Sequence, residues 1–138
     1  MMGIMALDVG TKTIGVATGL MDSRLPKPLL TLKRVSVKKD VIKLVKLCMK
    51  QEIRHVVVGL PLHLDGTEGR SARLARQIGE GLRQAAELSI HYQDERFSTI
   101  FAEETLRKLG KSANKRKRII DQAAAAIILK SWFDDQPT

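Results

Sequence analysis

The chain has one cysteine, few aromatic residues and no long apolar run, and each shortage excludes a class of protein. A lone cysteine, Cys48, excludes an internal disulfide framework and a zinc site built on several cysteines. No uninterrupted apolar stretch approaches the roughly 18 residues that a membrane helix requires. The three Phe, one Trp and one Tyr are too scattered to form a platform on which nucleic-acid bases would stack.

The N-terminus lacks the features of a secretory signal peptide, which are a basic flank, a continuous apolar segment and a small-residue cleavage site. Asp8 and Gly10 would interrupt such a segment. We therefore expect a cytoplasmic protein that does not bind membranes. No repeat, low-complexity tract or linker-like stretch divides the chain, so we expect one domain covering residues 1–138. Cys48 lies in an amphipathic run and is expected in the core.

Basic residues outnumber acidic ones, 24 to 15, which gives a formal net charge of +9 and a pI near 10.0. Such an excess favours a polyanionic partner, with nucleic acid ahead of a membrane surface. With so few aromatic side chains, recognition would depend on phosphates and on the shape of the nucleic acid. We expect the protein to act as a monomer or a weak homodimer.

The hydrophobic pattern predicts a mixed α/β fold. A three-stranded antiparallel meander followed by alternating helices and strands implies a five-stranded mixed sheet flanked by helices. In the first helix, Val41, Ile42, Val45 and Met49 form the stripe expected to face the core. The expected strands cover residues 4–9, 14–19, 29–35, 55–59 and 89–92, and the expected helices cover residues 38–50, 71–88, 97–109 and 118–133.

Three carboxylates stand where a predicted element meets an end or a loop. Asp8 and Glu95 follow strand-like runs, and Asp121 opens an apolar helical stretch. A charged group beside a core gains nothing unless something pairs it, so three acids able to converge suggest a divalent metal site. The four alanines at 123–126 would let this helix approach the sheet closely and bring Asp121 toward Asp8.

The segment Asp8-Val9-Gly10-Thr11 admits two mechanisms and one structural explanation. Its turn could cradle a phosphate while Asp8 orders Mg²⁺ for nucleotide transfer, or Asp8 could be a metal ligand of a nuclease. An ordinary hairpin turn would explain the motif without chemistry. Nucleotide phosphotransferases built around this turn clamp their ligand between two domains, so a one-domain chain favours the nuclease.

A dense basic run leads directly to Asp121. Between Arg107 and Arg118 seven residues are basic and none is acidic. Such a run is usually a solvated loop, but beside an acid cluster it would attract a phosphate backbone toward a metal site. The residues expected to bind nucleic acid are Lys12, Lys111, Lys115, Arg116, Lys117 and Arg118.

Four segments together resemble the YqgF/RuvX family, whose members are described as Holliday junction resolvases and as nucleases of pre-16S rRNA. The segments are Leu7-Asp8-Val9-Gly10 with Ile14-Gly15-Val16-Ala17, Val58-Gly59-Leu60-Pro61 with Asp65-Gly66, Asp94-Glu95-Arg96, and Ile120-Asp121-Gln122-Ala123-Ala124. The resemblance implies an RNase H-like α/β fold, with Asp8, Glu95 and Asp121 as catalytic residues that bind Mg²⁺ or Mn²⁺. Thr13 departs from the pattern, because the family commonly carries Arg there; the loss would weaken a phosphate contact, for which Lys12 could substitute.

The resulting hypothesis is a metal-dependent endonuclease that acts on structured nucleic acid, with the 5′ end of precursor 16S rRNA as the favoured substrate. One alternative is a Holliday junction resolvase acting in DNA recombination. Another is a non-catalytic RNA-binding factor of ribosome assembly, and a third is a nucleotide-binding protein of the actin-like ATPase superfamily. His63 is a weak candidate for a base near the site, whereas His55 and His91 flank strands and are expected to be structural.

Overall fold

The strands form one mixed sheet in the order β3-β2-β1-β4-β5. The structure is a computed structural model, in which residues 3–95 and 113–137 are described. β1 pairs antiparallel with β2, and β2 with β3, while β4 runs parallel to both β1 and β5. The elements are β1 (Gly3–Val9), β2 (Thr13–Leu20), β3 (Lys27–Lys33), α1 (Val37–Lys50), β4 (Ile53–Leu60), α2 (Arg70–Ala85), β5 (Ser89–Asp94) and α4 (Ala113–Asp134).

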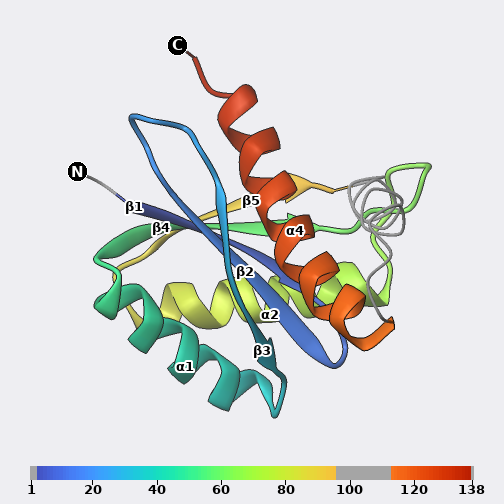
Figure 1. Cartoon of the computed structure of the whole chain (residues 1–138). Coiled ribbons are helices and arrows are strands. Elements are labelled where there is room, and N and C mark those ends of the chain that lie inside the picture. Colours follow the sequence, from blue (N-terminus) through green and yellow to red (C-terminus); the bar gives the residue numbers. More distant parts are fainter. Residues whose placement is uncertain (1–2, 96–112, 138) are drawn as a thin grey trace.

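Helices cover both faces of this sheet, as Figure 1 shows, with α1 and α2 on one side and α4 on the other. Successive side chains of a strand point to opposite faces, so β1 contributes to two cores. Met5 and Leu7 pack in the α1–α2 core, whereas Ile4 and Ala6 pack against α4. The predicted five-stranded mixed sheet with flanking helices is confirmed. No helix in the described ranges is both long and apolar enough to cross a bilayer.

Several element boundaries differ from the predictions. The second helix ends at Ala85 rather than at 88, because the chain turns there into β5. The last helix begins at Ala113, so residues 115–118 are helical instead of belonging to a loop. The helix expected at 97–109 lies outside the described residues.

The buried face of α1 differs from the predicted stripe. Val41, Leu44 and Cys48 are buried, as expected for Cys48, but Ile42 and Met49 are 47% and 74% exposed. The helix is rotated because it also buries Asp40, which is 2% exposed. Its carboxylate accepts hydrogen bonds from Arg34 Nε at 2.9 Å and from the Val35 amide at 3.0 Å. A hydrophobic pattern treats an acid as exposed, so it does not predict an acid that is buried together with a cationic partner.

The same arginine links the start of α1 to the turn after β1. Arg34 Nη1 donates a 3.0 Å hydrogen bond to the carbonyl of Gly10, and its amide donates to the carbonyl of Lys12 at 2.8 Å. The Asp40 carboxylate therefore fixes an arginine that in turn holds the β1–β2 turn. This turn lies directly beyond Asp8.

Candidate functional site

Asp8 and Glu95 meet at one end of the sheet. Asp8 is the penultimate residue of the central strand β1, and it follows Ile4 and Ala6 onto the face covered by α4. Glu95 comes directly after β5, and its amide donates a 3.2 Å hydrogen bond to the carbonyl of Leu60 at the end of β4. Glu95 is only 7% exposed. A hydrogen bond joins the two carboxyl groups.

Burial dominates the electrostatics of this pair. It raises the pKa of both carboxyl groups, because each loses the water that stabilises its charged form. Asp8 raises the pKa of Glu95 further, through its charge and through the hydrogen bond, and the charge of Asp121 adds to the increase at Asp8. The hydrogen bond between them lowers the pKa of Asp8 and raises that of Glu95, the directions expected when Glu95 is the protonated partner. Two neighbouring carboxyl groups, one half-buried and one buried, whose charged forms are disfavoured in this way form a site suited to a cation.

Glycines on the strands beside β1 make room for the acids. A Cβ atom at Gly59 in β4 would lie 2.8 Å from Oε2 of Glu95, so the missing side chain leaves the space that this carboxyl group occupies. Gly15 in β2 is the pairing partner of Asp8 in the sheet. A Cβ atom at Gly15 would collide with the backbone carbonyl of Asp121. The backbone of α4 thus touches the sheet beside Asp8.

Asp121 is held at this contact by a hydroxyl group. Thr13 Oγ1 donates a 2.6 Å hydrogen bond to Asp121 Oδ2. Asp121 is close enough for its charge to act on Asp8. Within the described ranges, no three His, Cys, Asp or Glu side chains are grouped as a metal site. The site therefore consists of a tight pair, Asp8 and Glu95, with Asp121 on its flank.

The basic residues predicted to bind nucleic acid are only partly described. Lys12 is exposed in the turn between β1 and β2, one residue before Thr13. The described part of the structure does not include the side chains of Lys111, Lys115, Arg116, Lys117 and Arg118, so their role stays a prediction. His63 is exposed in the loop after β4, whereas His55 and His91 contact each other through Nδ1 and Nε2 at 3.3 Å.

Three residues important to this geometry were not predicted as such: Thr13, Gly15 and Gly59. A glycine inside a strand often marks a close approach of another backbone or group, and this signal was available at both glycines. Thr13 offered no comparable signal, because its partner is 108 residues away in the sequence. Only the docking of α4 onto β2 brings them together.

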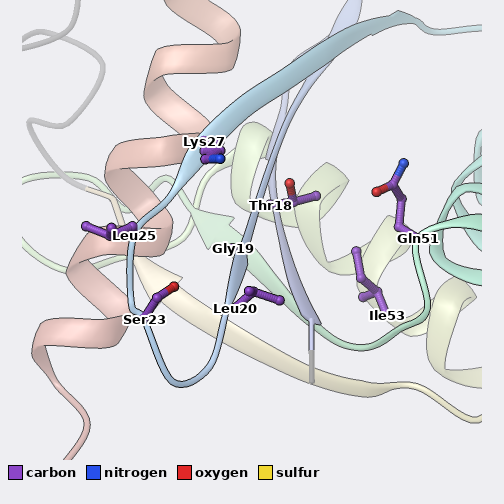
Figure 2. A pocket seen from close by; sticks show the side chains of 8 residues that line it. All are labelled: Thr18, Gly19, Leu20, Ser23, Leu25, Lys27, Gln51 and Ile53. Carbon is purple, nitrogen blue, oxygen red and sulfur yellow. The ribbon is translucent and has the colours of Figure 1, made fainter. Parts of the chain in front are cut away.

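A cavity of about 260 Å³ lies at the opposite end of the sheet (Figure 2). Leu20, in its lining, pairs with Gly3 in the register of β1 and β2, whereas Asp8 pairs with Gly15. Lys27 is the one charged residue among the eight that line it, and none is acidic. The cavity is therefore separate from the site at Asp8.

Comparisons of sequence identify relatives along nearly the whole chain. A family described as "RuvX: Holliday junction resolvase" matches residues 2–135. A protein from Myxococcus xanthus named "Putative pre-16S rRNA nuclease" is 40% identical over 133 residues, which cover 96% of this chain and 88% of that protein. One of the same name from Caldanaerobacter subterraneus is 38% identical over 136 residues, covering 98% of both chains.

Solved structures share the fold at much lower identity. RuvC of T. thermophilus, in complex with a Holliday junction substrate, superposes with a TM-score of 0.61 at 15% identity, covering 97% of this chain and 94% of its own. The Fowlpox virus resolvase, in complex with Holliday junction DNA, superposes with a TM-score of 0.59 at 12% identity. The match covers 96% of this chain and 97% of the resolvase chain. These likenesses support an RNase H-like fold, as the sequence predicted.

Proposed function

The chain belongs to the RuvX family, and from this premise we propose that it is a metal-dependent endonuclease that processes the 5′ end of precursor 16S rRNA in the cytoplasm. The observation that carries the proposal is the pair of half-buried Asp8 and buried Glu95, with Asp121 on its flank. A fold has no structural need for two acids that compete for one proton beside its core. Such a pair is useful when a cation replaces the proton.

The side chains of the site fit a hard divalent cation. Carboxylate oxygens are the ligands that Mg²⁺ and Mn²⁺ prefer, and cysteine, which would favour softer metals, is absent from the site. Asp8 and Glu95 would hold the ion, and Asp121 would contribute from the flank. A bound ion there would activate water for attack on phosphorus and stabilise the charge on the leaving oxygen.

The chain's own residues prepare this site in three ways. Gly59 and Gly15 leave the space that Glu95 and the backbone of Asp121 occupy. Thr13 orients the carboxylate of Asp121 through its hydrogen bond. Lys12, exposed on the adjoining turn, places a positive charge where a phosphate backbone would approach Asp8.

Precursor rRNA is favoured over a DNA junction because of the degree of relatedness. The proteins that are 40% and 38% identical carry the name of a pre-16S rRNA nuclease. The resolvases in complex with junction DNA share the fold at 15% and 12% identity. The family description nevertheless names Holliday junctions, so a four-way DNA junction is the second substrate to compare.

The test compares cleavage by the parent protein, Asp8→Asn and Asp22→Asn, with Mg²⁺ or Mn²⁺, on a 5′-extended 16S rRNA fragment and on a four-way DNA junction. Asp22 is an exposed aspartate whose carboxylate accepts a hydrogen bond from the Ser23 amide, so its variant controls for the substitution itself. We expect the parent and Asp22→Asn to cut the RNA at a defined position, and Asp8→Asn to be inactive while keeping its fold.

Each other outcome selects a different function. Preferential cutting of the junction would identify a DNA resolvase. Tight, metal-independent RNA binding without cleavage by any variant would identify an assembly factor that has no nuclease activity. Cleavage by Asp8→Asn at the parent's rate would remove Asp8 from the mechanism.

A further inference from the structure

The outer face of α1 carries a row of lysines that the proposed active site does not use. Lys39, Lys43, Lys46 and Lys50 are all exposed, and at 100° per residue they fall within about 60° of one another around the helix. We call them the α1 lysine row. Over about 17 Å of helix, it presents positive charge directly away from the buried residues Val41, Leu44 and Cys48.

In the described part of the chain, this charge has no acidic partner. The only acidic residue of α1 is Asp40, which is buried against Arg34. Within residues 3–95 and 113–137, no lysine of the row forms an ion pair. The neighbouring α2 is different, because its Arg76 and Arg83 are paired with Glu68 and Glu80.

Helix stability does not account for the row. Lysines four residues apart repel each other, as Lys39 and Lys43 or Lys46 and Lys50 do. Lys39 also lies in the first turn, where the helix dipole disfavours a cation. Only Lys50, in the last turn, is favoured by the dipole. A bound polyanion would relieve this repulsion.

The row begins near the proposed active site. The segment before α1 is tied to the β1–β2 turn, because the Arg34 amide and guanidinium donate to the carbonyls of Lys12 and Gly10. The first turn of α1 therefore lies at the same end of the sheet as Asp8, and the helix then runs away from it on the opposite layer from α4 (Figure 1). A nucleic acid engaged at Asp8 can continue past Lys12 onto this helix.

The chemistry of the surface favours a phosphate backbone over a membrane. An interfacial helix inserts a broad apolar face into lipid, but the apolar face of α1 is already buried in the core. On the outside only Ile42 and Met49, which flank the row, are apolar. Evenly spaced cations without aromatic side chains suit phosphates and carry no means of reading bases.

We propose that the α1 lysine row binds the backbone of a duplex arm of the substrate, remote from the bond that is cut. This inference rests on the proposed function, since it assigns the row to the same nucleic acid that reaches Asp8. The duplex is RNA if precursor rRNA is the substrate and DNA if a junction is. The shared ligand chemistry is the phosphodiester backbone.

The experiment compares two variants, one that loses the four charges of the row and one that loses four charges on other elements. Lys39, Lys43, Lys46 and Lys50 are changed together to Gln in one variant. In the control variant, four exposed cations of other elements that form no ion pair among the described residues, Lys27, Arg54, Arg70 and Arg73, are changed to Gln. Both variants lower the formal net charge of +9 by four. Binding to fluorescent duplex RNA and duplex DNA of about 20 base pairs is measured by anisotropy from 50 to 200 mM KCl, with EDTA to prevent cleavage.

We expect the row variant to bind at least tenfold more weakly at 100 mM KCl, with the magnitude of the slope of log K against log [KCl] reduced by about 3.6, since each of four lost phosphate contacts contributes about 0.9. The control variant should change both quantities much less. Comparison of the two duplexes shows whether the row binds RNA, DNA or both. Circular dichroism and a thermal melt establish that both variants are folded, and relief of repulsion should leave the row variant at least as stable as the parent.

Equal losses in the two variants, or an unchanged slope in the row variant, would overturn the inference. The inference would also be overturned if the row variant lost binding to vesicles containing phosphatidylserine but bound both duplexes as well as the parent does. The nuclease proposal fails separately, through absence of cleavage by the parent protein. The row variant should still cut a short substrate that lacks the remote duplex arm and should cut a longer substrate more slowly.

Discussion

The hydroxyl of Thr13 donates a 2.6 Å hydrogen bond to Oδ2 of Asp121, joining the first residue of β2 to a helix 108 residues further along the chain. The contact lies beside Gly15, where the backbone of α4 meets the sheet. It therefore fixes both the position of the helix and the direction of its carboxylate.

We predict that Thr13→Val weakens the binding of Mg²⁺ or Mn²⁺ by about tenfold or more, in the range seen when a hydrogen bond to a metal-binding side chain is removed. Valine keeps the shape of threonine but cannot donate to Asp121. Thr13→Ser retains the hydroxyl and should behave like the parent. The measurement is the rise in melting temperature as metal is added, with cleavage rate against metal concentration as a second readout. Identical metal titrations for Thr13→Val and the parent would show that Asp121 needs no such partner.

Gly15→Ala should destabilise the protein by about 1–3 kcal/mol, because its Cβ would meet the backbone of Asp121 and force α4 away from β2. The measurement is urea denaturation followed by circular dichroism. Gly69→Ala provides the control: its Cβ would meet the ring of His63 at 2.5 Å, but this exposed side chain can swing aside. If Gly15→Ala and Gly69→Ala unfolded at the same urea concentration, α4 would be free to shift away from the added methyl group.

Asp40→Ala should cost about 3–5 kcal/mol, since it leaves the guanidinium of Arg34 buried without its carboxylate. The two side chains are only 9% and 3% exposed. Glu68→Ala removes the acid from the exposed pair with Arg76, where water replaces the lost partner, and should barely move the urea midpoint. Because Arg34 also holds the carbonyl of Gly10, Asp40→Ala should slow cleavage by loosening the turn beside Asp8. If Asp40→Ala and Glu68→Ala had similar urea midpoints, the greater cost expected for the buried pair would be wrong.

His91 should make the fold less stable in mild acid. Burial, and then the charge of nearby His55, lower the pKa of His91 below its ordinary value of 6.5. The unfolded chain therefore binds more protons than the folded protein below that value, so stability falls as the pH decreases from about 6.5. The ring also packs against Trp132 of α4, with centroids 5.1 Å apart. Between pH 8 and pH 5, the melting temperature should decrease less for His91→Gln than for the parent. An equal decrease in the two proteins would show that other groups cause it.

The sequence allowed the sheet to be predicted, because apolar runs mark strands. It also allowed the acids near the strand ends to be singled out, because a charge beside an apolar run needs a partner. It did not reveal the buried face of α1. Asp40 lies inside that face because Arg34 and the Val35 amide neutralise it, and a hydrophobic pattern treats every acid as exposed. The partnership of Thr13 and Asp121 was equally inaccessible, since it arises only when α4 docks on β2.

The contact of α4 with β2 also has a consequence for the order in which the protein is made. A ribosome synthesises Asp8 first, Glu95 much later and Asp121 last of the three. Until the helix that carries Asp121 has emerged and docked beside Gly15, the third acid is missing from the site. In the proposed nuclease, cleavage can therefore begin only after α4 has docked and has brought Asp121 to the flank of Asp8 and Glu95.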